Sequence, residues 1–177
     1  LSLYDFTSAF PSVSRSFILM AMQYSGFPAW SVSLTSASWA GAKIVDEDGE
    51  FLYSMSGGVG QGCLAAASAF VIGINPMLTA LQAKLNVGGG ETLSAFADDI
   101  GIEVANTFVQ LPAILAVFAR WGSATALLFN SRKSAILPLW LFDEPIIRRW
   151  LRVVCRTFAS CIIDIYAKHL GTVVGLL

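Results

Sequence analysis

Two adjacent carboxylates, Asp98 and Asp99, lie between two short apolar runs of this 177-residue chain. Apolar runs on either side of a polar turn predict a β-hairpin, here with the two acids at its tip. Adjacent carboxylates repel each other and lose hydration when partly buried, so such a pair favours a nearby cation. A third acid, Asp5, follows another short apolar run, which predicts a strand of residues 1–5.

If this strand and the hairpin are neighbours in one sheet, the three carboxylates meet at the same end of it. Carboxylate oxygens are typical ligands of hard divalent cations, Mg²⁺ above all. Two such ions about 3.5–4 Å apart serve in-line phosphoryl displacement. Each acid also fits a simpler role, a solvated turn for Asp98 and Asp99 and a turn or helix cap for Asp5.

The periodicity of apolar residues predicts helices and strands that do not alternate strictly along the chain. The expected helices are residues 15–24, 29–39, 63–83, 108–125 and 145–158. The expected strands are residues 1–5, 42–45, 51–54, 133–139 and 162–168, with a hairpin at 92–105. We therefore expect one α+β domain in which an antiparallel β-sheet packs on helices.

Hydrophobic residues make up 55% of the chain and charged residues only 13%, against about 45–50% and 25% in ordinary globular domains. Residues 16–42 and 51–83 carry no charge, and each stretch is long enough to cross a hydrocarbon layer of about 30 Å. Polar residues, glycine and proline interrupt both stretches. A small membrane protein is therefore an alternative, although no membrane is expected.

The net charge of −1 is unusual for a protein that binds nucleic acid, but the charges are separated along the chain. Residues 1–119 hold three Lys or Arg against nine Asp or Glu, whereas residues 120–177 hold eight against three. The basic part, with Arg148, Arg152 and Arg156 at helical spacing, is either a phosphate-binding face or a solvated one. Three cysteines without metal-ligand spacing predict reduced, mostly buried thiols of an intracellular protein.

Five blocks in order resemble the palm of a reverse transcriptase, closest to that of non-LTR retrotransposons. They are residues 4–13 (YDFTSAFPSV), 58–63 (GVGQGC), 96–99 (FADD), 129–134 (FNSRKS) and 167–171 (AKHLG). Each block alone is weak, but five in the right order are specific. The resemblance implies that residues 1–177 form a partial reverse transcriptase domain, from the first catalytic Asp motif to a primer-grip-like turn, with fingers and thumb largely missing.

This resemblance implies an RNA-directed DNA polymerase that adds dNTPs to a DNA primer on an RNA template. The implied metal ligands for two Mg²⁺ ions, or Mn²⁺ in their place, are Asp5, Asp98 and Asp99. The implied catalytic residues are these three acids and Lys133, which would steady the leaving pyrophosphate. The implied dNTP contacts are Phe6, Ala9, Phe10, Gln61 and Gly62. The implied primer contacts are Lys168, His169, Leu170 and Gly171.

The resemblance also leaves alternatives. Phe10 stands where the family has an aromatic gate against the 2′-hydroxyl, and it also fits a core role. Gly60, Leu64, Ala66, Ala67 and Ala126 depart from the usual family residues, so a catalytically dead or co-opted relic that binds nucleic acid is the main rival. We expect a retroelement polyprotein as the parent, and a fragment inactive without the parent's fingers and thumb.

Overall fold

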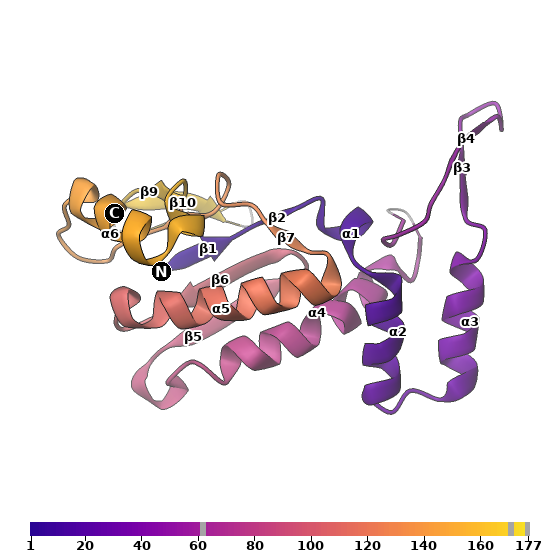
Figure 1. Cartoon of the computed structure of the whole chain (residues 1–177), viewed down its shortest axis with the longest axis horizontal. Coiled ribbons are helices and arrows are strands. Elements are labelled where there is room, and N and C mark those ends of the chain that lie inside the picture. The colour runs from indigo at the N-terminus through magenta and orange to yellow at the C-terminus, as the bar shows by residue number, and fades with distance from the viewer. Residues whose placement is uncertain (61–62, 170–171, 176–177) are drawn as a thin grey trace.

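A five-stranded, mostly antiparallel sheet forms the centre of the computed structural model, which describes residues 1–60, 63–169 and 172–175 (Figure 1). Its strand order is β5 (Thr92–Phe96), β6 (Asp99–Glu103), β1 (Ser2–Tyr4), β8 (Ala135–Ile136) and β9 (Ile162–Ile163). Only β8 and β9 run parallel to each other. The predicted fold class, an α+β domain with an antiparallel sheet packed on helices, is confirmed.

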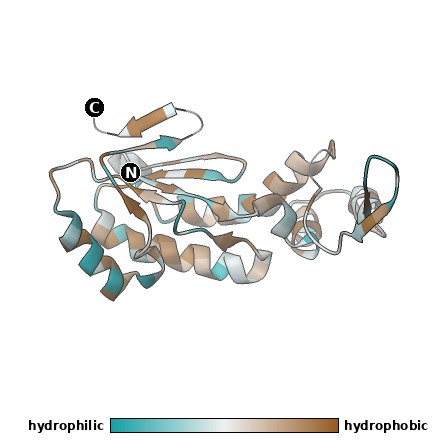
Figure 2. Ribbon diagram, turned by 90° about the horizontal axis from the view of Figure 1, so that it is seen from above, coloured by the Kyte–Doolittle hydropathy of each residue, from teal (hydrophilic) through white to brown (hydrophobic). Residues whose placement is uncertain are grey.

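The two faces of the sheet have different covers, because successive side chains of a strand point to opposite sides. Tyr4 belongs to the main core, which is built with two helices, α4 (Ala66–Gln82) and α5 (Thr107–Thr125). Leu3 belongs to a smaller cluster on the other face, which β10 (Tyr166–His169) and β11 (Thr172–Gly175) cover. Figure 2 shows the resulting order of helices, sheet and hairpin.

A projecting region extends from one end of this layered body (Figure 1). It comprises the helices α2 (Arg15–Tyr24) and α3 (Ala29–Trp39) and the hairpin of β3 (Lys43–Val45) and β4 (Phe51–Ser54). Both helices have the predicted bounds, because Ser14 caps the start of α2 and the segment between them carries Gly26 and Pro28. The Arg15 guanidinium donates hydrogen bonds to the carbonyl oxygens of Trp39, Met55 and Gly58 and so ties the chain on both sides of the hairpin to the start of α2.

The predicted helix 145–158 ends earlier than its apolar pattern suggests. α6 (Glu144–Val154) stops where Cys155 leaves the helical region, with φ −134° and ψ 60°, and a short 3₁₀ turn, η2 (Arg156–Phe158), follows. Placing Arg156 on one helical face with Arg148 and Arg152 was therefore wrong. Arg148 is also engaged within the protein, because it forms an ion pair with Glu144.

Two predicted strands are shorter than expected. In the strand predicted at 133–139, Lys133 and Ser134 instead close a turn, with both backbone N–H groups donating to the Asn130 carbonyl. The strand predicted at 162–168 divides into β9 and β10 at Asp164, whose carboxylate accepts the Ile165 backbone N–H. A small sheet of β2 (Phe6–Thr7) and β7 (Leu128–Phe129) was not predicted, since two-residue strands leave no periodic signal.

Ala126 ends α5 with φ 61°, in the left-handed region. Ala126 is one of the predicted departures, near the place of a usual glycine, and a left-handed conformation costs an alanine about 1–2 kcal/mol. The departure costs stability and leaves the sheet intact.

Among the described residues, no helix is both long and apolar enough to span a bilayer. The membrane alternative predicted such a helix. Of the three cysteines, Cys155 and Cys161 are buried and Cys63 is exposed, which agrees with mostly buried free thiols.

Candidate active site

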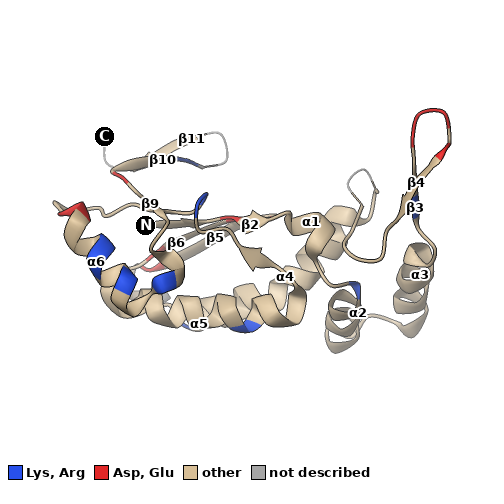
Figure 3. Ribbon diagram, turned by 45° about the horizontal axis from the view of Figure 1, so that its top comes forward, with Lys and Arg blue, Asp and Glu red and all other residues tan. Residues whose placement is uncertain are grey.

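Asp5 and Asp99 stand at the same end of two paired strands. β1 and β6 are antiparallel neighbours in which Tyr4 pairs with Ile100. The next residue beyond each of these is Asp5 on one strand and Asp99 on the other, so both carboxylates leave the same edge of the sheet. Figure 3 shows acidic residues where β5, β6 and β2 come together. The strand pairing therefore brings the first sequence block, with Asp5, next to the third, with Asp99, as predicted.

The predicted Asp-Asp hairpin is present, with a loop of two residues. Phe96 pairs with Asp99 across β5 and β6, so Ala97 and Asp98 form the turn. Ala97 has φ 53°, as the first loop residue of a favoured two-residue hairpin requires. An alanine in this conformation is strained, and strain of this kind is typical of functional sites.

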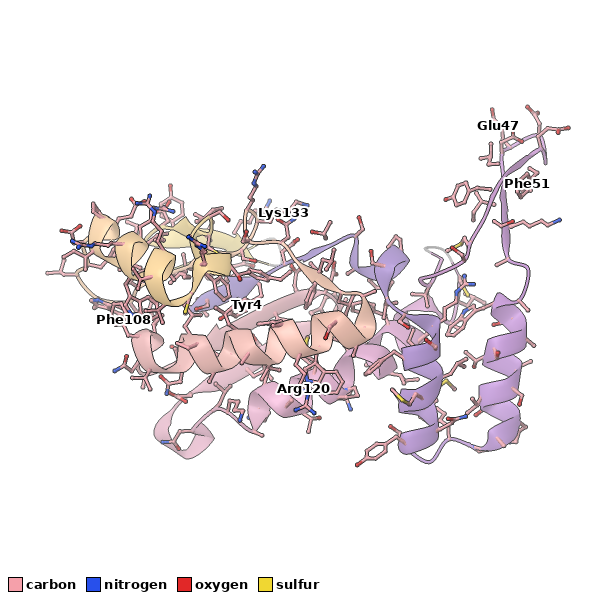
Figure 4. All side chains as sticks on the ribbon, viewed as in Figure 1. Tyr4, Glu47, Phe51, Phe108, Arg120 and Lys133 are labelled. Carbon is pink, nitrogen blue, oxygen red and sulfur yellow. The ribbon has the colours of Figure 1, made fainter. Side chains whose placement is uncertain are left out.

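The fourth sequence block is tied directly to Asp5. The Asp5 backbone N–H donates to Ser134 Oγ at 3.1 Å, and the Asp5 carbonyl accepts the Asn130 N–H at 2.9 Å. Ser134 Oγ in turn donates to the Asn130 carbonyl at 2.8 Å. These bonds fix the turn that carries Lys133 beside Asp5, and Figure 4 shows the Lys133 side chain projecting from it above the sheet.

A cavity of about 400 Å³ lies over this part of the sheet. Its lining includes two acids of the predicted site, Asp5 and Asp99, and two of its cations, Lys133 and Lys168. The cavity therefore joins residues from β1, β6, β10 and the turn before β8. It combines carboxylates for a metal ion with cations for phosphate groups.

Burial raises the pKa of the Asp5 carboxyl above its ordinary value. The nearby Lys133 cation counteracts part of this rise, whereas the charges of Asp98 and Asp99 add to it. All three neighbours thus act electrostatically on Asp5. An Asp5 that is ionised at neutral pH is held there at a cost in stability, which a bound cation would relieve.

The donor set fits a divalent cation chemically. Asp5 Oδ1 is buried and accepts no hydrogen bond from any described residue, and an unpaired buried carboxylate oxygen calls for a cation or water. Within the same residues, however, no three His, Cys, Asp or Glu side chains converge closely enough to hold a metal ion. A shared site therefore requires the Asp98 and Asp99 side chains to turn toward Asp5.

The residues predicted to contact the nucleotide sugar follow Asp5 on β2 and α1 (Ala9–Ser12). Phe10 is half-buried and stacks on Phe70 of α4, with ring centroids 4.4 Å apart and planes inclined by 17°. Phe6 and Ala9 are buried in the main core. One face of the Phe10 ring is thus held by Phe70. This packing is compatible with both predicted roles, an aromatic gate against the 2′-hydroxyl and a core residue.

The glycine-rich second block is bound to the first. Gly58 N–H donates to the Val13 carbonyl at 3.1 Å, and Val59 N–H donates to the Phe10 carbonyl at 2.8 Å. Gly58 has φ 67°, and a Cβ on it would lie 2.1 Å from the Pro11 carbonyl oxygen. Only glycine allows this approach, which brings the second block alongside the segment that follows Asp5. Gln61 and Gly62 themselves lie outside the described residues.

Two of the predicted primer-contact residues, Lys168 and His169, lie on β10. Lys168 is exposed on β10 and lines the cavity. His169 is the last residue of β10 and pairs with Thr172 of β11. Leu170 and Gly171 lie outside the described residues.

Two residues with a structural role were not predicted from the sequence. Ser134 anchors Asp5 and was visible only as the end of the fourth block. Glu91, at the end of the β5–β6 hairpin away from the acids, is buried and accepts hydrogen bonds from the Asn86 and Ala105 backbone and from the Gln110 side chain. A lone Glu between a glycine run and a strand carries no sequence signal for such a role.

A family model described as reverse transcriptase (RNA-dependent DNA polymerase) matches residues 1–153. The matched region contains the first four sequence blocks and ends before β10. No curated protein matches the chain.

Proposed function

Because the chain belongs to the reverse transcriptase family, we propose that it is the palm of an RNA-directed DNA polymerase from a retroelement of the non-LTR type. The observation that carries this proposal is the pairing of β1 with β6, which sets Asp5 and Asp99 at one sheet edge beside Lys133. The proposed substrates are dNTPs and a DNA primer annealed to an RNA template.

The proposed reaction is nucleotidyl transfer. The primer 3′-hydroxyl gives its proton to solvent water and its oxygen attacks the α-phosphorus of the dNTP. A new P–O bond forms, and the bond between the α-phosphorus and the oxygen of the β-phosphate breaks to release pyrophosphate. Asp5, Asp98 and Asp99 are the residues that would hold two Mg²⁺ ions, and these ions supply charge neutralisation on the attacking and leaving oxygens. The Lys133 ammonium group would offset negative charge that develops on the pyrophosphate, a role supported by its place in the lining of the same cavity as Asp5 and Asp99.

The dNTP pocket is proposed to lie between the segment that follows Asp5 and the glycine-rich second block, which Gly58 brings together. Phe10, supported by Phe70, would contact the sugar at the 2′ position, with Phe6 and Ala9 behind it and with Gln61 and Gly62 beside the base. Lys168, His169, Leu170 and Gly171 would hold the primer backbone. A rigid aromatic gate of this kind selects by steric exclusion, because a 2′-hydroxyl meets the ring.

Phe10→Val is expected to relax this selection. The smaller side chain leaves room for a 2′-hydroxyl, so the preference for dNTPs over rNTPs falls by about 10- to 200-fold, the range for a small steric difference in a pocket. The measurement is the ratio of kcat/KM for dTTP and rUTP in primer extension. Phe108→Val, on α5 and outside the site, is the control and keeps the wild-type ratio. An unchanged ratio in Phe10→Val contradicts the gate.

Primer extension on an RNA template tests the proposed function. The chain is expressed within its natural reading frame and supplied with dNTPs and Mg²⁺. The expected result is template-directed extension that EDTA abolishes and added Mg²⁺ restores. A folded protein that binds the primer–template and Mg²⁺ without extending it would favour the relic, in which Gly60 and Leu64 are the first departures to revert.

A further inference from the structure

The hairpin of β3 and β4 exposes an apolar surface. Val45, Phe51, Leu52 and Tyr53 are each 51% to 57% exposed. The two strands form a sheet of their own, which projects from the body of the molecule (Figure 1). Exposed apolar side chains gathered beside charged ones are typical of a protein-binding surface. The hairpin therefore has an apolar surface that is available to a partner.

The tip of the same hairpin is acidic. Four exposed acids lie in its turn, Asp46, Glu47, Asp48 and Glu50. None of them forms an ion pair with any residue that the structure describes, and Figure 4 shows Glu47 at the far end of the hairpin. The only cation of the hairpin, Lys43, lies over the Phe51 ring. The hairpin surface, residues 43–54, thus combines apolar side chains with negative charge that the chain itself leaves unpaired.

The outer side of α6 combines apolar side chains with positive charge. Ile146, Arg152 and Val153 lie three or four positions from Arg149 and therefore share a side of the helix with it. All four are exposed, Ile146 by 63% and Val153 by 79%. Within the described ranges, neither arginine forms an ion pair. The α6 surface, made of these four residues, is thus opposite in charge to the hairpin surface and similar to it in apolar character.

The hairpin surface and the α6 surface do not meet within one molecule, because they lie at its opposite ends (Figure 1, Figure 3). Two copies can bring them together, since opposite charges attract and apolar side chains on both surfaces lose their contact with water. A nucleic acid is a poorer match. Its phosphates suit the arginines of α6 but not the aliphatic side chains beside them, and they are repelled by the hairpin.

We propose that the chain binds a second copy of itself, with the hairpin surface of one copy on the α6 surface of the other. Glu47 and Asp48 then face Arg149 and Arg152, and the apolar strands of the hairpin cover the aliphatic side chains of α6. Exposed ion pairs add little affinity but decide which surfaces meet. The apolar contact supplies most of the attraction. This inference goes beyond the proposed function and does not depend on it.

Charge reversal on each surface tests this contact. The hairpin variant is Glu47→Lys/Asp48→Lys, which spares Asp46 because its Oδ1 accepts the backbone N–H groups that shape the turn. The α6 variant is Arg149→Glu/Arg152→Glu. Sedimentation velocity over a range of protein concentrations measures the mass of the wild type, of each variant alone, and of an equimolar mixture of the two variants.

The control variant is Lys84→Glu/Arg120→Glu, which reverses two exposed cations outside both surfaces and changes the net charge as much as the α6 variant does. The wild type and the control are expected to gain mass as the concentration rises. In each reversed variant alone, like charges face each other, so self-association weakens about tenfold or more. The mixture is expected to associate like the wild type, because each reversed surface meets an opposite charge on the other variant.

A wild type that stays monomeric at every concentration would overturn the inference. Wild-type association in either reversed variant alone would also overturn it, and so would a mixture that fails to associate. Fluorescence anisotropy of a labelled RNA–DNA duplex covers the other occupant of α6. Weaker duplex binding by the α6 variant than by the control, with a monomeric wild type, assigns α6 to nucleic acid and refutes self-association. Thermal unfolding of each variant confirms that folded proteins are compared.

Discussion

Asp5→Asn is expected to abolish DNA synthesis while making the protein more stable at neutral pH. The substitution removes a carboxylate charge from the proposed metal site, which costs several kcal/mol of electrostatic stabilisation and about 10³-fold or more in kcat. It also removes a charge whose pKa burial has raised. The free energy of unfolding therefore rises, because the folded state no longer holds a partly desolvated anion.

The pH dependence of this stabilisation has a definite sign. The ordinary pKa of the Asp5 carboxyl is 3.8, and its value in the folded protein is higher. Below pH 3.8 the wild-type group is protonated in both the folded and unfolded states, so the variant has no advantage. The advantage grows as pH rises through the folded pKa and is complete above it. Thermal unfolding of both proteins across this range measures it.

Mg²⁺ provides a control in the same experiment. A bound cation relieves the repulsion at Asp5, so Mg²⁺ is expected to raise the Tm of the wild type and to leave that of Asp5→Asn unchanged. Asp143→Asn, an exposed acid before α6 whose side chain makes no capping bond, should behave like the wild type. Substantial extension by Asp5→Asn would remove Asp5 from the active site.

Gly58→Ala is expected to lower the free energy of unfolding strongly. The added Cβ would lie 2.1 to 2.5 Å from backbone atoms of Pro11, and φ is 67°. The left-handed conformation costs about 1–2 kcal/mol and the forced backbone shift about 1–3 kcal/mol, so the loss is about 2–5 kcal/mol. Denaturant unfolding measures it.

Gly26→Ala is the matched control for this substitution. Gly26 has a similar φ of 78°, but a Cβ there would have no atom within 4 Å. The loss in Gly26→Ala is therefore about 1–2 kcal/mol, from conformation alone. Equal losses in the two variants would mean that the second block does not press against α1 as the structure has it.

The sequence predicted correctly those helices and hairpins whose ends are set by capping, helix-breaking or turn residues nearby in the chain. Ser14, Gly26 and Pro28 mark the ends of α2 and α3, and apolar runs around Asp98 and Asp99 mark the hairpin. It missed the break at Cys155, because neither proline nor glycine stands there and the chain leaves the helix to bury Cys155 and Phe158. Helix ends set by tertiary packing have no such local signal.

The acids of the candidate site could be predicted from the sequence, but the residue that holds Asp5 in place could not. Asp5 and the Asp98–Asp99 pair could be found because each follows or interrupts an apolar strand. The hydrogen bond from the Asp5 N–H to Ser134 Oγ joins residues 129 positions apart. A serine in a turn gives no sequence signal for a partner so far away in the chain.

Primer extension by the wild type beside Asp98→Ala tests the central claim most directly. Both proteins are expressed in the natural reading frame and given an RNA template, a DNA primer, dNTPs and Mg²⁺, with Asp143→Ala as the control for loss of an exposed acid. The expected result is extension by the wild type and by Asp143→Ala, and none by Asp98→Ala. Equal extension by all three proteins would contradict a polymerase site built on Asp98.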